Sequence, residues 1–272
     1  MMPDPSESPL RAVKVKLIRA EKHLSEVILA TRKYAQGECS ISLEKDSKLR
    51  MFVQRVRLFP SASPEISAIA GDFLANVKSI LDYIVWELVK TTPGSSPTTS
   101  NQFPITYTAS DFADQVARKR LRGVPTKAAA LIERLQPYNA GNSSLGTLNR
   151  LHNIDKHRTL NVVTVVADNT EVVSQSGEFA LFLGDEELHD GTVFGGIGIP
   201  FALAANMPDF QARLPNMKMH GKCSMFVAFD DESAEDLEGL RVDRTLQEIF
   251  EFVRDTVIPA FEPFFDRVPN TI

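Results

Sequence analysis

Apolar residues in several long stretches of the chain recur three and four positions apart, as on one face of an amphipathic helix. The clearest stretch follows Ser63 and Pro64, a typical helix start, and carries a wide apolar stripe to Lys90. The pattern predicts helices at residues 10–35, 63–90, 110–122, 125–135 and 143–157, and a last helix at 242–258.

A second pattern consists of short β-branched and aromatic runs separated by turn residues, which indicates strands. In the run at 49–59, Val56 and Leu58 share one face while Arg55 and Arg57 share the other. The pattern predicts strands at residues 39–43, 49–59, 162–166, 171–173, 179–183, 192–199 and 222–229.

A helix-rich part followed by a strand-rich part favours an α+β fold over a doubly wound α/β sheet. We expect a bundle of about four to five helices packed with an antiparallel β-sheet and a C-terminal helix. Residues 1–9 should form a disordered tail. No long linker follows, so residues 10–272 should form a single domain, helix-rich at 10–158 and strand-rich at 159–232, with the C-terminal helix at 240–260.

The composition, 43% hydrophobic and 24% charged, excludes disordered and fibrous proteins. We expect no membrane association, because no apolar run reaches the length of a span and the N-terminus does not resemble a signal peptide. Cys39 and Cys223 are the only cysteines, too few for a disulfide framework, so we expect a reducing cytoplasm.

The net charge of −5 argues against coating nucleic acid by bulk electrostatics, but its distribution is uneven. Residues 118–158 hold nine basic side chains and only two acidic ones, Glu133 and Asp155. This basic stretch therefore carries +7 and the remaining chain −12. It either forms a positive patch for an anionic ligand or consists of ordinary solvated helix faces.

Two sets of polar residues are candidates for a site. A rotation of about 100° per residue aligns Asp72, Asn76, Ser79, Tyr83 and Glu87 in one row on the helix at 63–90. Asp72, Asn76 and Tyr83 would bind substrate if the row faces a second helix, although any amphipathic helix has such a row. Trp86 flanks the row and is a candidate stacking platform.

The second set lies near the end of the helix at 143–157. Arg150, Asn153 and His157 fall within about 60° of each other on that helix. Arginine binds phosphate oxygens in a forked geometry, and histidine titrates near neutrality, so the three could cleave a phosphodiester as catalytic residues. Lys156 and Arg158 would then bind substrate.

The structural alternative is that Asp155 and its neighbours join helix to sheet, without catalysis. A metal or cofactor is not expected, because His152 and His157 point about 140° apart and the sequence has no metal-binding or phosphate-loop motif.

Several segments resemble those of a group of uncharacterised bacterial proteins, in the same order. They are Gly71-Asp72-Phe73-Leu74-Ala75-Asn76-Val77-Lys78-Ser79-Ile80-Leu81-Asp82-Tyr83-Ile84-Val85-Trp86, Phe103-Pro104-Ile105, Leu135-Gln136-Pro137-Tyr138 and Asp155-Lys156-His157-Arg158. The resemblance spans residues 65–165 and implies that they form one unit, with no activity attached.

Arg150 and His157, separated by six residues, also resemble the signature of HEPN domains, many of which are metal-independent ribonucleases. The resemblance implies cleavage of RNA or a nucleotide at a site usually assembled across a homodimer. Leu151 departs from the polar residue that usually follows the arginine, and the strands are not part of a minimal HEPN bundle. The rival hypothesis is a non-catalytic binding or scaffold protein in which Asp155-Lys156-His157-Arg158 is structural.

Overall fold

The computed structural model describes residues 9–48, 50–59, 61–166, 170–174, 180–183, 191, 193–200, 218–230, 237 and 239–265. Residues 1–8 of the expected tail lie outside this range. The chain divides into two compact units, one formed by residues 1–27, 67–160 and 243–272 and the other by 28–66 and 161–242. The first unit is helical and the second contains the sheet, which confirms the α+β class. The single domain over 10–272 stays a prediction.

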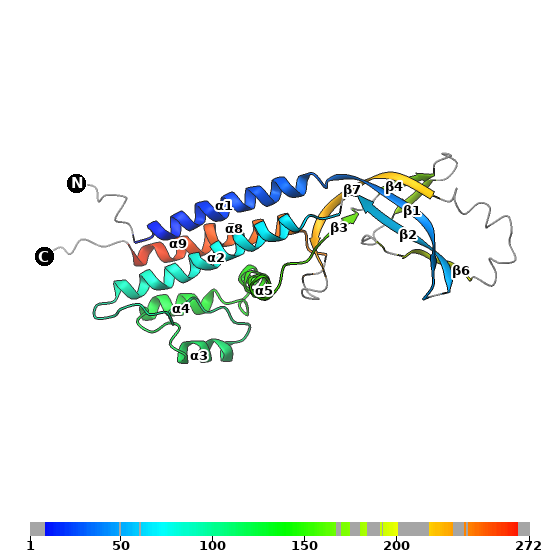
Figure 1. The fold of residues 1–272 in the computed structure, drawn as a ribbon. Coiled ribbons are helices and arrows are strands. Elements are labelled where there is room, and N and C mark those ends of the chain that lie inside the picture. Colours follow the sequence, from blue (N-terminus) through cyan, green and yellow to red (C-terminus); the bar gives the residue numbers. More distant parts are fainter. Residues whose placement is uncertain are drawn as a thin grey trace. The chain divides into compact units, whose positions relative to one another are not determined.

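The helical unit is built from segments distant in sequence. Its elements are α1 (Arg11–Arg32), α2 (Pro64–Thr91), α3 (Ala109–Ala117), α4 (Thr126–Arg134), α5 (Ser143–His157), α8 (Val242–Phe252) and α9 (Ile258–Phe261), with the unit boundary inside α1 and near the start of α2. Helices α1, α2 and α8 run side by side (Figure 1). Lys16 contacts Asn76 between α1 and α2, and Phe73 packs on Phe250 between α2 and α8.

Helix α2 forms the centre of this unit. The apolar stripe predicted from its sequence is buried except at Ile69, which is half-buried; Val77, Ile80 and Ile84 are completely buried. The Ser63 hydroxyl accepts a hydrogen bond from the Glu65 amide at 3.3 Å, which confirms the predicted cap. Burial of this stripe makes α2 a rigid support for the polar residues on its other faces.

Two helices differ from prediction at their ends. Helix α3 stops at Ala117 rather than 122, because the chain turns through Lys119, which has a positive φ of 69°. The C-terminal helix changes to a π-helical turn at Val253–Val257 before α9. Pro259 has no amide to donate to the carbonyl of residue 255, so a regular α-helix cannot continue through it.

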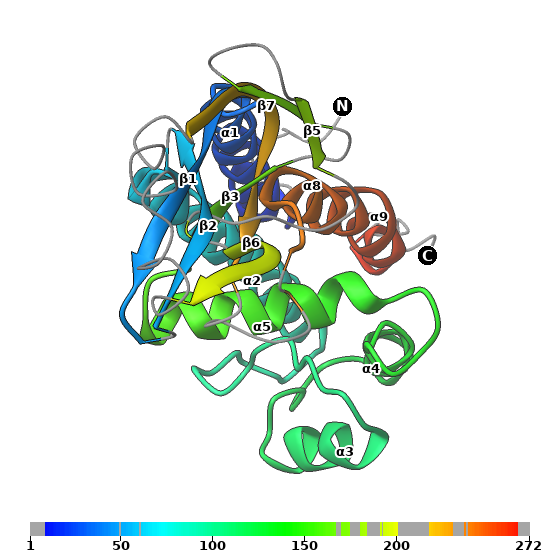
Figure 2. The ribbon, with the colours of Figure 1, turned by 90° about the vertical axis from the view of Figure 1, so that its right-hand side faces the viewer.

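The second unit is an antiparallel sheet with the order β5-β4-β7-β1-β2-β6, in which β3 also pairs with β7 (Figure 2). Its strands are β1 (Gln36–Asp46), β2 (Met51–Phe59), β3 (Val162–Val166), β4 (Thr170–Ser174), β5 (Ala180–Leu183), β6 (Val193–Pro200) and β7 (Lys218–Phe229). The long strand β7 pairs with β3 and β4 and also with β1, which lies far from all three in sequence. It therefore organises the sheet.

Cys39 in β1 is buried and disulfide-bonded. The expectation of reduced cysteines is therefore wrong for this residue. A count of two cysteines indicates no framework, but strand pairing, not the count, decides which cysteines come together. The cytoplasmic location, which rested on that count, stays a prediction without this support.

Candidate functional site

The predicted catalytic residues lie on the exposed face of α5. The helix has the predicted bounds and buries Leu145, Leu148 and Leu151. Arg150, Asn153 and His157 are all exposed on the opposite side. Because Arg150 and His157 are seven residues apart, their backbones are separated by about 10 Å along the helix axis. Only extended side chains could therefore meet at one phosphate.

Lys156 and Arg158, predicted to bind substrate, are also exposed at the C-terminal end of α5. Basic residues in the last turn of a helix complement the negative end of its dipole. That same negative end disfavours an anion, so this region is a weaker phosphate site than its charge alone suggests.

The predicted residues of α2 are not brought to the Arg150–His157 face. Gly71 of α2 faces the Asp155 carboxylate, and a Cβ built on Gly71 would lie 2.7 Å from Asp155 Cγ. Asp155 points about 140° away from Arg150 around α5. Asp72 is exposed near Asp155, whose pKa is raised by burial and also by the charge of Asp72. Asn76 instead faces α1, where its side-chain oxygen accepts a hydrogen bond from Lys16 Nζ at 3.1 Å.

A polar cluster that the sequence did not reveal lies on α2. Lys78 Nζ pairs with Asp82 Oδ1 at 2.8 Å, and the same oxygen accepts a hydrogen bond from the Phe103 amide at 2.8 Å, which ties α2 to the loop at Phe103. Burial, together with Lys78, lowers the pKa of His152 on α5. Burial also raises the pKa of Asp155. Helix α5 meets α2 where the Asp155 carboxylate approaches Gly71, and this contact is the α2–α5 brace.

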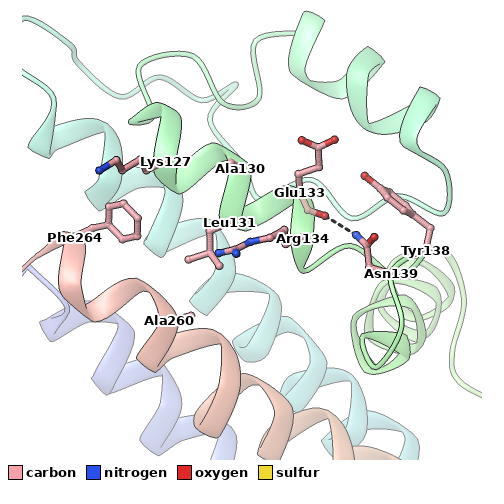
Figure 3. Close-up of a pocket in the computed structure, with 9 residues that line it drawn as sticks. All are labelled: Lys127, Ala130, Leu131, Glu133, Arg134, Tyr138, Asn139, Ala260 and Phe264. Atoms are coloured by element: carbon pink, nitrogen blue, oxygen red, sulfur yellow. Dashed lines mark hydrogen bonds between the residues drawn. The ribbon is translucent and has the colours of Figure 1, made fainter.

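A cavity of about 920 Å³ in the helical unit lies between α4 and the C-terminal helix (Figure 3). Lys127 and Arg134 line it from one face of α4, seven residues apart. Leu131 and Phe264 supply apolar walls. The cavity thus combines two cations with apolar surface, which suits an organic anion.

The acidic residue of this cavity points away from the cations. Figure 3 shows the Arg134 side chain reaching into the space between α4 and α9, whereas the Glu133 carboxylate lies on the other side of α4. Asn139 donates a hydrogen bond to the Glu133 carbonyl at 2.9 Å, which fixes the loop after α4. Arg134 can therefore offer its forked donors to a ligand.

Tyr138 adds an unsatisfied polar atom to the cavity wall. Its hydroxyl is buried and has no hydrogen-bond partner among the described residues. Burial, with a smaller contribution from Glu133, raises the pKa of Tyr138, so the hydroxyl keeps its proton. Figure 3 shows this hydroxyl on the Glu133 side of α4, so it is not directed at the cations. The sequence signal that could have indicated this cavity is the seven-residue spacing of Lys127 and Arg134 within the basic stretch, which places both on one face of a helix.

Two absences hold for the described part of the chain. No group of three or more histidine, cysteine, aspartate or glutamate side chains there is arranged to hold a metal ion. No helix there has both the length and the apolar composition needed to cross a bilayer.

The function of this chain is inferred from the site geometry above. Comparisons of the chain with family models, curated proteins and solved structures give no match.

Proposed function

We propose that this protein binds a nucleotide in the α4–α9 cavity and does not act as a catalyst there. The observation that carries the proposal is the placement of Lys127 and Arg134 beside apolar walls in a cavity of about 920 Å³. That volume lies in the range of small-molecule and cofactor sites. The two cations would hold phosphate oxygens, and Phe264 would contact the base.

The position of Asp155 supports a binding role over catalysis by the segment 155–158. Asp155 packs on Gly71 and belongs to the α2–α5 brace. This contact supports the alternative in which Asp155 is structural, although its partner is helix α2 and not the sheet. The basic stretch then has divided roles, with Lys127 and Arg134 in the cavity and Asp155 in the helix contact.

Calorimetric titration with AMP tests the proposal. We expect Arg134→Gln or Lys127→Gln to weaken AMP binding about tenfold, because each removes a charge-assisted hydrogen bond to phosphate. Adenosine should bind the unmodified protein more weakly than AMP, by about the same factor.

Arg122→Gln is the matched control, because Arg122 is exposed in the same basic stretch and does not line the cavity. It should leave AMP affinity within about twofold of the original value. Equal binding of adenosine and AMP, or an equal loss in Arg122→Gln, would contradict a phosphate site in this cavity.

A second candidate function, metal-independent phosphodiester cleavage on α5, is favoured by the exposure of Arg150, Asn153 and His157 on one face. Arg150 would bind phosphate, His157 would transfer the proton and Asn153 would orient substrate. The resemblance to HEPN domains supports a site shared between two copies of the chain.

For this candidate, His157→Ala should abolish cleavage of a single-stranded RNA in EDTA, since no other group would replace the proton transfer. Its melting temperature should change little, because His157 is exposed. Thr159→Ala, exposed two residues away, is the control. Persistent cleavage by the His157 variant, or loss of cleavage on chelation alone, would refute this chemistry.

A further inference from the structure

A smaller cavity of about 590 Å³ lies elsewhere in the helical unit, between the start of α1, the middle of α2 and the loop at 98–102. Its character differs from that of the α4–α9 cavity. Two aromatic and two acidic side chains of α2 line it, and none of its lining residues is a lysine or arginine. The two cavities therefore select ligands of different charge.

Tyr83 and Trp86 form the aromatic wall. They are three residues apart on α2, which makes them neighbours on the helix surface. Their exposed fractions are 38% and 41%, whereas the neighbouring apolar residues Leu81, Ile84 and Leu88 of the same helix are completely buried. The face of an exposed aromatic ring attracts cations, so two such side chains in one cavity wall suit a cationic ligand.

Asp82 and Glu87 give the cavity acidic character. Each carboxylate pairs with a lysine that does not line the cavity. Asp82 pairs with Lys78 and Glu87 pairs with Lys90, each at an N–O distance of 2.8 Å. The Lys90 side chain is 53% exposed, so its pairing with Glu87 is weak. The carboxylates consequently assist the ring faces instead of binding a cation alone.

The wall opposite α2 is preformed. Asn101 is buried, its side-chain oxygen accepts the Thr98 amide at 2.8 Å, and its side-chain nitrogen donates to the Arg122 carbonyl at 2.9 Å. These bonds hold the loop at 98–102 in place. A preformed wall lowers the ordering cost of binding.

We propose that this cavity binds an organic ammonium cation, with the charged group over Tyr83 and Trp86 and its substituents toward Asp82 and Glu87. The proposal concerns a different cavity and a ligand of opposite charge from the nucleotide site. Failure of one therefore leaves the other untouched.

Trp86 is the only tryptophan of the chain and reports directly on this cavity. Choline, titrated at constant ionic strength, should change its fluorescence saturably. The uncharged isostere 3,3-dimethylbutan-1-ol should bind at least about twofold to fivefold more weakly than choline, because it lacks the charge that makes a cation–π contact. Tyr83→Ala should weaken choline binding by a similar factor.

Glu87→Gln should weaken choline but not the isostere, because only choline carries the charge. Glu65→Gln is the matched control, since Glu65 is an exposed acid in the first turn of the same helix and does not line the cavity. The proposal is overturned if the isostere binds as tightly as choline, if Tyr83→Ala leaves the affinity unchanged, or if choline produces no saturable signal.

Discussion

Gly37→Ala is expected to lower the free energy of unfolding by about 3 kcal/mol, the upper end of the cost of overpacking a tight site. A Cβ at Gly37 in β1 would lie 2.6 Å from the carbonyl oxygen of Phe59 and would also overlap the end of the Met225 side chain. The side chain of Met225 can rotate. The carbonyl cannot move freely, because Phe59 is held opposite Glu38 in the β1–β2 ladder.

Urea denaturation of the two proteins measures this effect. Gly141→Ala is the matched control, since a Cβ there meets nothing within 4 Å and only the positive φ of 83° opposes it. Its expected cost is about 1 kcal/mol, from the left-handed backbone. If Gly37→Ala costs no more than Gly141→Ala, the close approach of β1 to Phe59 is not as tight as described.

The effect of Gly71→Ala is expected to change sign with the residue at position 155. In the original protein the new methyl group would collide with the half-buried Asp155 carboxylate, and we expect a loss of about 1–2 kcal/mol. In an Asp155→Ala background the collision is absent. Gly71→Ala should then stabilise by about 1 kcal/mol, because alanine favours a helix interior over glycine by that amount.

A double-mutant cycle with urea denaturation of all four proteins gives the coupling between the two positions. Asp155→Ala alone should destabilise by no more than about 1 kcal/mol, because the burial that raises the pKa of this carboxyl disfavours its ionised form and offsets the packing lost at Gly71. The same effect of Gly71→Ala in both backgrounds would mean that α2 and α5 do not meet at this pair.

The sequence predicted most elements because their signals are local. The apolar stripe of α2 and the cap at Ser63 depend on residues within a few turns, and both were confirmed. Errors arose where the local signal was incomplete. The turn at Lys119 requires a positive φ at a position where the sequence has no glycine to indicate it. The π-helical turn before Pro259 compensates for the amide that proline lacks.

The candidate sites could be predicted only in part, because a site depends on which helix faces meet. Helical spacing placed Arg150, Asn153 and His157 on one face, and that face is exposed. The same spacing could not show which neighbour each face meets. Asp72 therefore lies near Asp155 and Asn76 contacts Lys16 of α1, so neither joins Arg150, Asn153 and His157.

What the sequence determined by itself was thus the periodic content of this protein: its helices and strands, its α+β class and the faces of each helix. The tertiary structure alone decided which faces meet. Lys127 and Phe264 are 137 positions apart in the sequence, and Gly71 and Asp155 are 84 positions apart. No local sequence pattern encodes such pairs. The burial of apolar side chains from the whole chain brings such residues together. The cavities and the α2–α5 brace therefore form only when the chain has folded.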